Sequence, residues 1–467
     1  MNNTSIEEIY PLSPMQEGML FHSLHSVEFG MYVMQDACTM LHLNLPAFKQ
    51  AWERVVERHA ILRTAFAWKN IEKPLQVVGK QVSLPWQEHD WRDLPVSEQE
   101  ARFASFITED RINGFKLSKA PLMRLAFFRI GEDIYKFIWS KHHLLLDGWS
   151  RYLLLKEVLA YYEAFCDGRD VQFERPRPFR DYIAWLQQQD LAKAEAFWRQ
   201  TLEGFATPTT IEAAGNSAKA SDEGYDHYCE VLRLSVETTA ALQTFARKHQ
   251  LTMNTLVQGA WALLLSHYSG ETDVAFGATV SGRPAELLGV ETMVGVFINT
   301  LPVRAQIRVE QAVGDWLKGL QAYQVEMRQY EYSPLAFVRG WSELQRGQNL
   351  FDTIVVFENF PVDHSLRERT ITLQVQDSRV LLRHNYPLVL VADPANGLML
   401  QIFYDHRLFD SAIVLKMLDH LKRVLEQMPA DAAQRLGDIV LESYDQAMLS
   451  QNQADAQFGD ELEQFSF

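Results

Sequence analysis

In this chain of 467 residues, a histidine followed four residues later by an aspartate occurs twice between an apolar stretch and a predicted helix. His143 and Asp147 stand four residues apart in the first copy, and His406 and Asp410 repeat that spacing in the second. A repeated unit that cannot bury its apolar face alone must pack against another unit. The pattern therefore predicts two half-chains of related topology that pack together or hold a site between them. Coincidence is the alternative interpretation of this single pair.

The first copy is richer in residues that carry chemistry than the second. It contains a second histidine, His142, and a glycine, Gly148, whereas the second copy has Asp405 and Ser411 at those positions. If the duplication is real, we expect that only the first half kept the chemistry.

The residues around the first copy predict a strand, a short loop and a helix. Apolar runs at 122–130 and 134–139 are typical of two strands joined by the turn at 131–133. After the loop, apolar residues recur at helical spacing, and Asp147 or Ser150 is the candidate N-cap. The histidines therefore stand where a strand ends.

A histidine at the end of a strand can present its ring to a channel, and imidazole is well matched to proton transfer near neutral pH. Asp147 has two open roles, either orienting the ring or turning away to pair with an arginine. Gly148 would let a substrate or another backbone approach closely. The structural alternative is that both histidines are satisfied polar groups and that Asp147 merely caps the helix.

Several other classes of site are disfavoured by the sequence. Adjacent residues of a strand point to opposite faces, so His142 and His143 do not easily share an ion, and we predict no metal site. The three cysteines, Cys38, Cys166 and Cys229, support neither a disulfide framework nor a zinc site and fit a reducing cytosol. The motifs of serine hydrolases, NTPases and dinucleotide enzymes are missing after every predicted strand.

The charge balance argues against nucleic acid as a partner. Lys and Arg number 44 against 60 Asp and Glu, the formal net charge is −16, and no basic stripe occurs. The N-terminus has no basic segment followed by an apolar core, and no stretch approaches ~18 uninterrupted apolar residues. We therefore expect no membrane span, no secretion signal and a cytoplasmic location.

The length predicts more than one compact unit. Pro176 and Pro178, followed by a predicted helix over 181–204, mark the hand-over from the first unit to the second. A stretch rich in Ala, Thr, Ser and Gly at 206–224 predicts an exposed loop. We accordingly place an N-terminal lobe at 1–177, a C-terminal lobe at 178–448 and an acidic tail or interdomain linker at 449–467.

The motif HHxxxDG, followed by Trp149 and Ser150, resembles the signature of nonribosomal peptide synthetase condensation domains. Four more segments are similar to motifs of that family and occur in its order, at 10–22, 58–66, 179–185 and 280–304. The opening segment and the HHxxxDGWS form most resemble the subclass that joins an L-residue donor to an L-aminoacyl acceptor. The last family motif is only partly visible around 383–388, and no adenylation or carrier signature is present.

This resemblance implies a mixed α/β (α+β) fold. Two chloramphenicol acetyltransferase-like lobes would form a V, with His143 in a tunnel between them. Phosphopantetheine arms of a donor and an acceptor carrier protein would enter from opposite faces, an adenylation domain would be the neighbour, and no cofactor would be bound covalently. The resemblance also implies that Arg63 pairs with Asp147, which makes both residues structural.

The site residues follow from the same resemblance together with the chemistry above. His143 is the main catalytic candidate, either as general base or as a hydrogen-bond partner that positions the amine. His142 is the second candidate, more in support of the loop, and the Gly148 N–H is a candidate donor to the developing oxyanion.

Further residues are expected at the tunnel and at the surface. Trp149, Ser150 and Asn299 are the candidates for the tunnel wall. Phe21 and Leu24 are the candidates for binding the acceptor carrier protein, although buried core is the commoner fate of such residues.

The resemblance implies amide bond formation between a donor thioester and an acceptor amine. Three alternatives remain at this point. An epimerisation domain shares HHxxxDG, a CoA-dependent acyltransferase shares HxxxDG, and a non-catalytic relative would only dock carrier proteins or recruited enzymes.

Overall fold

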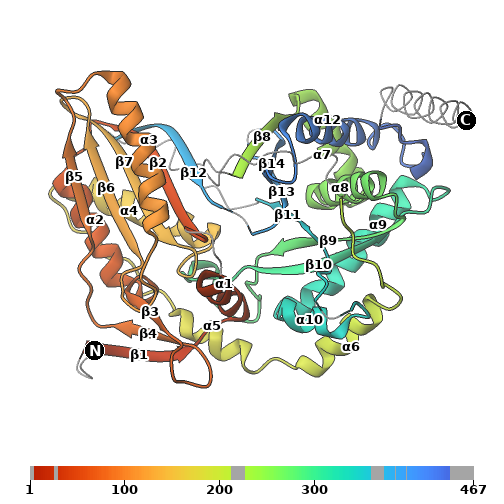
Figure 1. The fold of residues 1–467 in the computed structure, drawn as a ribbon, viewed down its shortest axis with the longest axis horizontal. Helices are drawn as coiled ribbons and strands as arrows, with labels where there is room; N and C mark the ends of the chain where they lie inside the picture. Colours follow the sequence, from red (N-terminus) through yellow and green to blue (C-terminus); the bar gives the residue numbers. More distant parts are fainter. Residues whose placement is uncertain are drawn as a thin grey trace, which may run out of the picture.

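The computed structural model describes residues 5–25, 30–211, 227–345, 347–358, 373–383, 385–395 and 397–441. Most of the predicted loop at 206–224 and all of the predicted tail at 449–467 lie outside these residues. The elements of the first half gather in one lobe and most elements of the second half gather in another (Figure 1).

The first lobe contains a five-stranded sheet and a smaller three-stranded sheet. The larger sheet has the order β12-β2-β7-β6-β5, with bounds Gln374–Leu381, Val33–Leu41, Ile134–His142, Met123–Arg129 and Trp86–Asp90. The smaller has the order β1-β4-β3, with bounds Ile6–Pro11, Leu75–Gly79 and Thr64–Ala67.

The helices of the first lobe pack on these sheets. They are α1 (Pro14–His25), α2 (Leu45–Arg58), the 3-10 turn η2 (Ala60–Arg63), α3 (Val96–Asn113) and α4 (Gly148–Cys166). A core that includes Trp52 of α2, Trp139 of β7 and Leu154 of α4 fills the space between them.

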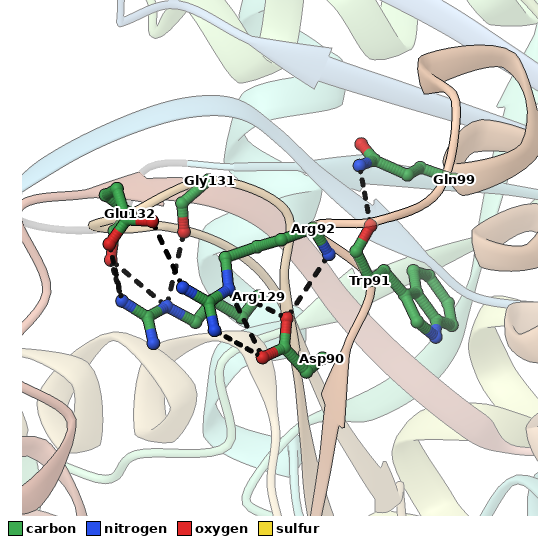
Figure 2. A network of polar contacts seen from close by, with 7 residues as sticks. All are labelled: Asp90, Trp91, Arg92, Gln99, Arg129, Gly131 and Glu132. Atoms are coloured by element: carbon green, nitrogen blue, oxygen red, sulfur yellow. Dashed lines mark hydrogen bonds and ion pairs between the residues drawn. The ribbon is translucent and has the colours of Figure 1, made fainter.

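The predicted hairpin before the histidines is present as β6 and β7, which pair in antiparallel register. At the turn end of this hairpin, the Arg92 guanidinium donates to Asp90 at the end of β5 and to Glu132 in the turn, as Figure 2 shows. Arg129 donates to the Glu132 carbonyl, 3.1 Å away. This exposed network therefore lies at the end of the sheet that is farther from His143.

The second lobe is built on a six-stranded sheet of order β10-β9-β11-β13-β14-β8. The strand bounds are Asn299–Gln306, Asp273–Val280, Thr353–Phe357, Leu388–Asp393, Met399–Asp405 and His227–Arg233. The main helices are α7 (Val236–His249), α8 (Met253–Ser269), α9 (Val313–Met327), α10 (Leu335–Trp341) and α12 (Ser411–Gln427).

The single helix predicted over 181–204 is wrong. The chain forms α5 (Phe179–Leu186) and α6 (Leu191–Thr201) instead. Asp190 causes the restart, because its side chain accepts the backbone N–H groups of Ala192 and Lys193 at 3.0 and 3.2 Å and so caps α6.

Two segments of the second half cross into the first lobe. β12 pairs antiparallel with β2 and lies at the edge of the first sheet, beside it in Figure 1. The segment 281–298 also buries apolar side chains in the first-lobe core, among them Met293 and Phe297. The halves are therefore interlocked, while the boundary at residue 177 stays a prediction.

The repeated spacing of histidine and aspartate has a local cause in both lobes. Asp147 accepts the Ser150 N–H and caps α4, and Asp410 accepts the Ile413 N–H at 2.8 Å and caps α12. In each lobe the pattern thus marks the end of a strand followed by an N-capped helix.

Arg63 lies in η2 and is 6% exposed. Its guanidinium donates to the Glu7 carboxylate on β1 and to the carbonyls of Gly79 and Lys80 at the end of β4. The expected pair with Asp147 is therefore wrong, because these groups of the small sheet surround the Arg63 head. Arg63 is nevertheless structural, as it connects η2 to two strands.

We expect Arg63→Ala to lower the free energy of unfolding by roughly 2–4 kcal/mol, since a buried cation loses several acceptors and leaves them unpaired. Urea unfolding monitored by circular dichroism measures this change. The matched control is Arg92→Ala, which removes an exposed ion-pair network and should leave the unfolding midpoint within error. An unchanged midpoint for Arg63→Ala would contradict the structural assignment.

Candidate active site

His143 stands at the first position after β7. Its backbone N–H donates to the Tyr32 carbonyl at 2.8 Å, so the hydrogen bonding between the chains of β2 and β7 continues one residue past the strand. The side chain is 8% exposed and lines a cavity between the lobes. Among the described residues its Nδ1 has no hydrogen-bond partner. His143 is therefore held at its backbone, and its side chain borders the cavity.

Burial lowers the pKa of His143 below its ordinary value, and its own backbone and the charge of Asp147 offset this only in part. The imidazole is therefore neutral near pH 7, which is the form that accepts a proton or a hydrogen bond.

His142 lies on the other side of the strand end and does not line the cavity. Its Nδ1 accepts the Leu144 N–H at 3.2 Å, so the ring proton is on Nε2, which is 3.4 Å from the Ser23 hydroxyl. Burial lowers the pKa of His142 to about 3. The neutral ring thus holds the loop to α1, which corrects its inclusion among the catalytic candidates.

Asp147 is fully buried and bonded on every side. Its carboxylate accepts the Ser150 N–H at 2.7 Å and the Phe297 N–H at 2.9 Å, and lies 3.5 Å from the Arg283 guanidinium. The Asp147 N–H donates to the Gly295 carbonyl at 3.1 Å. Asp147 therefore joins the two halves, and these bonds direct its carboxylate away from a proton-relay role.

Arg283 takes the place that the resemblance assigned to Arg63. It is buried, donates to the Met293 carbonyl at 3.0 Å and the Ser150 hydroxyl at 3.0 Å, and lies 4.0 Å from the centre of the Phe297 ring. Its sequence signal was present, because Arg283 belongs to the motif at 280–304. Nothing in the spacing, however, indicated which arginine reaches Asp147.

Gly282 lets this segment approach closely. Its φ of 60° lies in the left-handed region, and a Cβ there would stand 1.8 Å from the Phe297 carbonyl oxygen. Its N–H donates to the Glu331 carboxylate at 3.1 Å. A residue with a side chain would therefore displace the segment that carries Arg283.

Ser150 is fully buried, so the expectation that it forms part of the tunnel wall is wrong. Its hydroxyl donates to the Gly295 carbonyl at 2.8 Å and accepts the Gly295 N–H at 3.0 Å. Ser150 instead belongs to the same buried network as Asp147.

Trp149 and Asn299, the other candidates for the tunnel wall, line the cavity, and so does Gly148, the candidate oxyanion donor. Gly148 begins α4, where a backbone N–H has no acceptor within the helix and the helix dipole is positive. The Trp149 indole N–H donates to the Glu291 carbonyl at 2.9 Å. Asn299 donates to the carbonyls of Glu331 and Ser333 at 2.8 and 2.7 Å. His143, Gly148 and Trp149 thus share one wall with residues of the second half.

The cavity has a volume of about 2510 Å³ and takes its walls from both halves. This exceeds the ~300–1,000 Å³ of an ordinary small-molecule pocket. Phe21 and Leu24 of α1 line it and are 57% and 39% exposed, so the alternative that they are core residues is wrong. Phe21 stacks on His25 with ring centres 4.3 Å apart.

A metal site and a membrane-spanning helix are both absent from the residues that the structure describes. Within them, no group of three His, Cys, Asp or Glu side chains is arranged to hold a metal ion. No helix within them combines the length and the apolar character that crossing a bilayer requires.

Comparison with known proteins identifies relatives along nearly the whole chain. Residues 6–449 match the family model described as condensation domain. The chain is 46% identical to one of the linear gramicidin synthase chains of Brevibacillus parabrevis over 435 residues, which is 93% of this chain and 6% of that synthase. It is 32% identical to surfactin synthase subunit 3 of Bacillus subtilis over 93% of this chain and 34% of that subunit. The chain thus spans a small part of these relatives.

Solved structures share the fold at low sequence identity. A four-domain nonribosomal peptide synthetase bound to AMP and glycine matches with a TM-score of 0.79 and 19% identity, over 96% of this chain and 35% of that one. The starter condensation domain of rhizomide synthetase matches with a TM-score of 0.75 and 19% identity, over 94% and 100%. The mixed α/β fold is therefore confirmed. This chain belongs to the condensation-domain family of nonribosomal peptide synthetases.

Proposed function

We propose that this chain joins two acyl groups that partner carrier proteins deliver on phosphopantetheine arms. The acceptor amine attacks the donor thioester carbonyl, the new C–N bond forms, and the C–S bond breaks. The amine loses one proton, and the departing donor thiolate takes one up. The observation that carries this proposal is a buried His143 on the wall of a cavity built from both halves, where burial lowers its pKa.

The main task of the protein in this reaction is to place the amine next to the thioester, because both groups are already reactive. An amine with a reference pKa of ~7.7–8.0 is partly neutral at pH 7, and a thioester is an activated acyl donor. Holding both reactants in line can supply up to ~7–11 kcal/mol of the barrier reduction. His143 Nε2 either takes the proton of the attacking amine or accepts its hydrogen bond. In the first role the ring becomes protonated during the reaction, and in the second it stays neutral.

The oxyanion that forms on the donor carbonyl needs a donor group on the same wall. The Gly148 N–H meets this need because it lies at the positive end of α4 and on the cavity. Asp147 takes no proton in this proposal, since Ser150, Phe297 and Arg283 already satisfy its carboxylate.

The proposed partners are a donor and an acceptor carrier protein and a neighbouring adenylation domain. Their support is that the relatives are much longer synthetases. The exposed Phe21 and Leu24 on α1 are the proposed contact for the acceptor carrier protein. The preference for L-residues on both carriers and a cytoplasmic location belong to the same proposal.

His143→Ala should slow dipeptidyl-carrier formation by ~100- to 10,000-fold if the residue is a general base, and by less if it only positions the amine. Mass spectrometry of the acceptor carrier protein after mixing both loaded carriers measures the rate. His143→Asn separates the roles, because Asn keeps a hydrogen bond but takes no proton at neutral pH. A rate for Asn close to wild type favours positioning, and a rate as low as that of Ala favours the base.

The same assay decides between the proposed function and its rivals. Wild-type turnover by His143→Ala would contradict the catalytic role and favour a docking platform. Turnover with free acyl-CoA and no carrier would favour the acyltransferase, and exchange at the donor Cα without amide formation would favour the epimerisation domain.

Phe21→Glu should raise the acceptor-carrier KM roughly 5- to 30-fold, as loss of an apolar contact at an interface typically does, while kcat and melting temperature stay near wild type. Steady-state kinetics with varied acceptor carrier measure this. Ile112→Glu on α3 is the matched control, because Ile112 is 50% exposed and lies outside the cavity wall. Equal effects from both substitutions would rule out a specific contact at Phe21.

The lowered pKa of His142 predicts a pH dependence of stability. Its folded pKa is about 3, against an ordinary value of ~6.5 for the unfolded chain. Between these two pKa values the unfolded state binds a proton at His142 and the folded state does not. The free energy of unfolding therefore falls as the pH drops below ~6.5. His142→Gln should reduce the loss of unfolding free energy between pH 7 and pH 5 by roughly 2 kcal/mol. Urea titrations at both pH values test this, and equal losses in the two proteins would contradict it.

A further inference from the structure

We propose that Asp36, which lies outside the HHxxxDG motif, is a positioning residue for the condensation reaction. Its carboxylate ties together the two ends of the loop that carries His143. This inference rests on the proposed function. It concerns a residue that reaches the reaction only through its neighbours, because Asp36 does not line the cavity.

The contacts of Asp36 enclose the catalytic loop on both sides. One carboxylate oxygen accepts the Lys141 ammonium on β7, and the other accepts the Arg151 guanidinium in the first turns of α4. Residues 142–148 run between these two partners along the chain. A single carboxylate on β2 therefore fixes where the loop leaves the strand and where it enters the helix.

The pairing of β2 with β7 explains why the three side chains meet. Asp36 stands opposite Trp139, and Met34 stands opposite Lys141. Because cross-strand pairs share a face and alternate residues return to it, Asp36, Trp139 and Lys141 project to the same side of the sheet. The Lys141 ammonium lies 3.8 Å from the centre of the Trp139 ring. The next residue on that side is His143.

The charges of this cluster depend on one another. Lys141 is fully buried, which lowers its pKa to about 8 against the opposing effect of Asp36. Burial alone would raise the pKa of Asp36, but Lys141 and Arg151 together hold it below its ordinary value. Removing one partner would leave a buried charge uncompensated. The cluster is therefore held in one arrangement, and the loop ends are held with it.

The arrangement matters for the reaction because of what the loop presents. His143 and Gly148, the proposed proton acceptor and oxyanion donor, both lie between the residues that Asp36 holds. Arg151 also lines the cavity, so the same carboxylate fixes a cation on that wall. A misplacement of ~1 Å among such groups can cost ~100-fold in rate.

The test compares Asp36→Asn with the double variant Asp36→Asn/Lys141→Met. The single variant should lose melting temperature and turnover, because Lys141 stays buried without its partner. The double variant removes both buried charges and should regain most of the melting temperature. We expect its kcat to stay 10- to 100-fold below wild type with the KM for both carriers unchanged. Asp36→Glu, which keeps the carboxylate, should recover part of kcat.

A second readout works without turnover and so separates this inference from the proposed function. In protein labelled at histidine ring carbons, with His143→Ala for assignment, the His143 signal should move in the double variant. The control is Lys141→Met, which removes the same ammonium but keeps the tie between Asp36 and Arg151, so the signal should move further in the double variant than in this control. If wild type makes no amide, the proposed function fails and this signal alone decides the inference.

Two outcomes would overturn the positioning role. One is a double variant with restored melting temperature and wild-type kcat, which would make Asp36 a charge partner of Lys141 and nothing more. The other is a His143 signal that is the same in the double variant as in Lys141→Met.

Discussion

A buried carboxylate, Asp147, carries the connection on which the site depends. It caps α4 in the first lobe and accepts the Phe297 N–H and the Arg283 guanidinium from the second half. Breaking such a buried network would leave charges unpaired in the interior. The segment 281–298 is therefore fixed against the HHxxxDG loop, and the cavity between the lobes has one defined wall.

Within the seven-residue motif, different residues hold the loop in place and are proposed to take part in the reaction. The Asp147 carboxylate and the His142 ring are buried and hydrogen-bonded within the protein, whereas His143 and Gly148, the residues proposed for the reaction, line the cavity. The burial that lowers the pKa of His143 also keeps its ring neutral near pH 7. The proposed role of each residue in the motif thus follows from whether its side chain is bonded in the interior or borders the cavity.

The second copy of the pattern lacks the tandem histidine and the glycine of the first. Asp410 still caps α12 after β14, just as Asp147 caps α4 after β7. In these two copies the aspartate is therefore the cap of the helix that follows the strand. The added His142 and Gly148 distinguish the first copy, and the second lobe contributes walls instead, through residues such as Asn299.

The sequence by itself determined the features that depend on neighbouring residues. The hairpin ending at His142 and the cap at Asp147 are local, so periodicity and capping preferences predicted them, and the resemblance of short segments to family motifs pointed to the fold. The tertiary structure alone decided which distant groups meet. Arg283 rather than Arg63 reaches Asp147, and Ser150 is buried, because 281–298 crosses into the first-lobe core. Asp36 belongs to none of the sequence motifs. Its proposed role depends on the pairing of β2 with β7 and on a buried ion pair, and neither can be predicted from spacing along the chain.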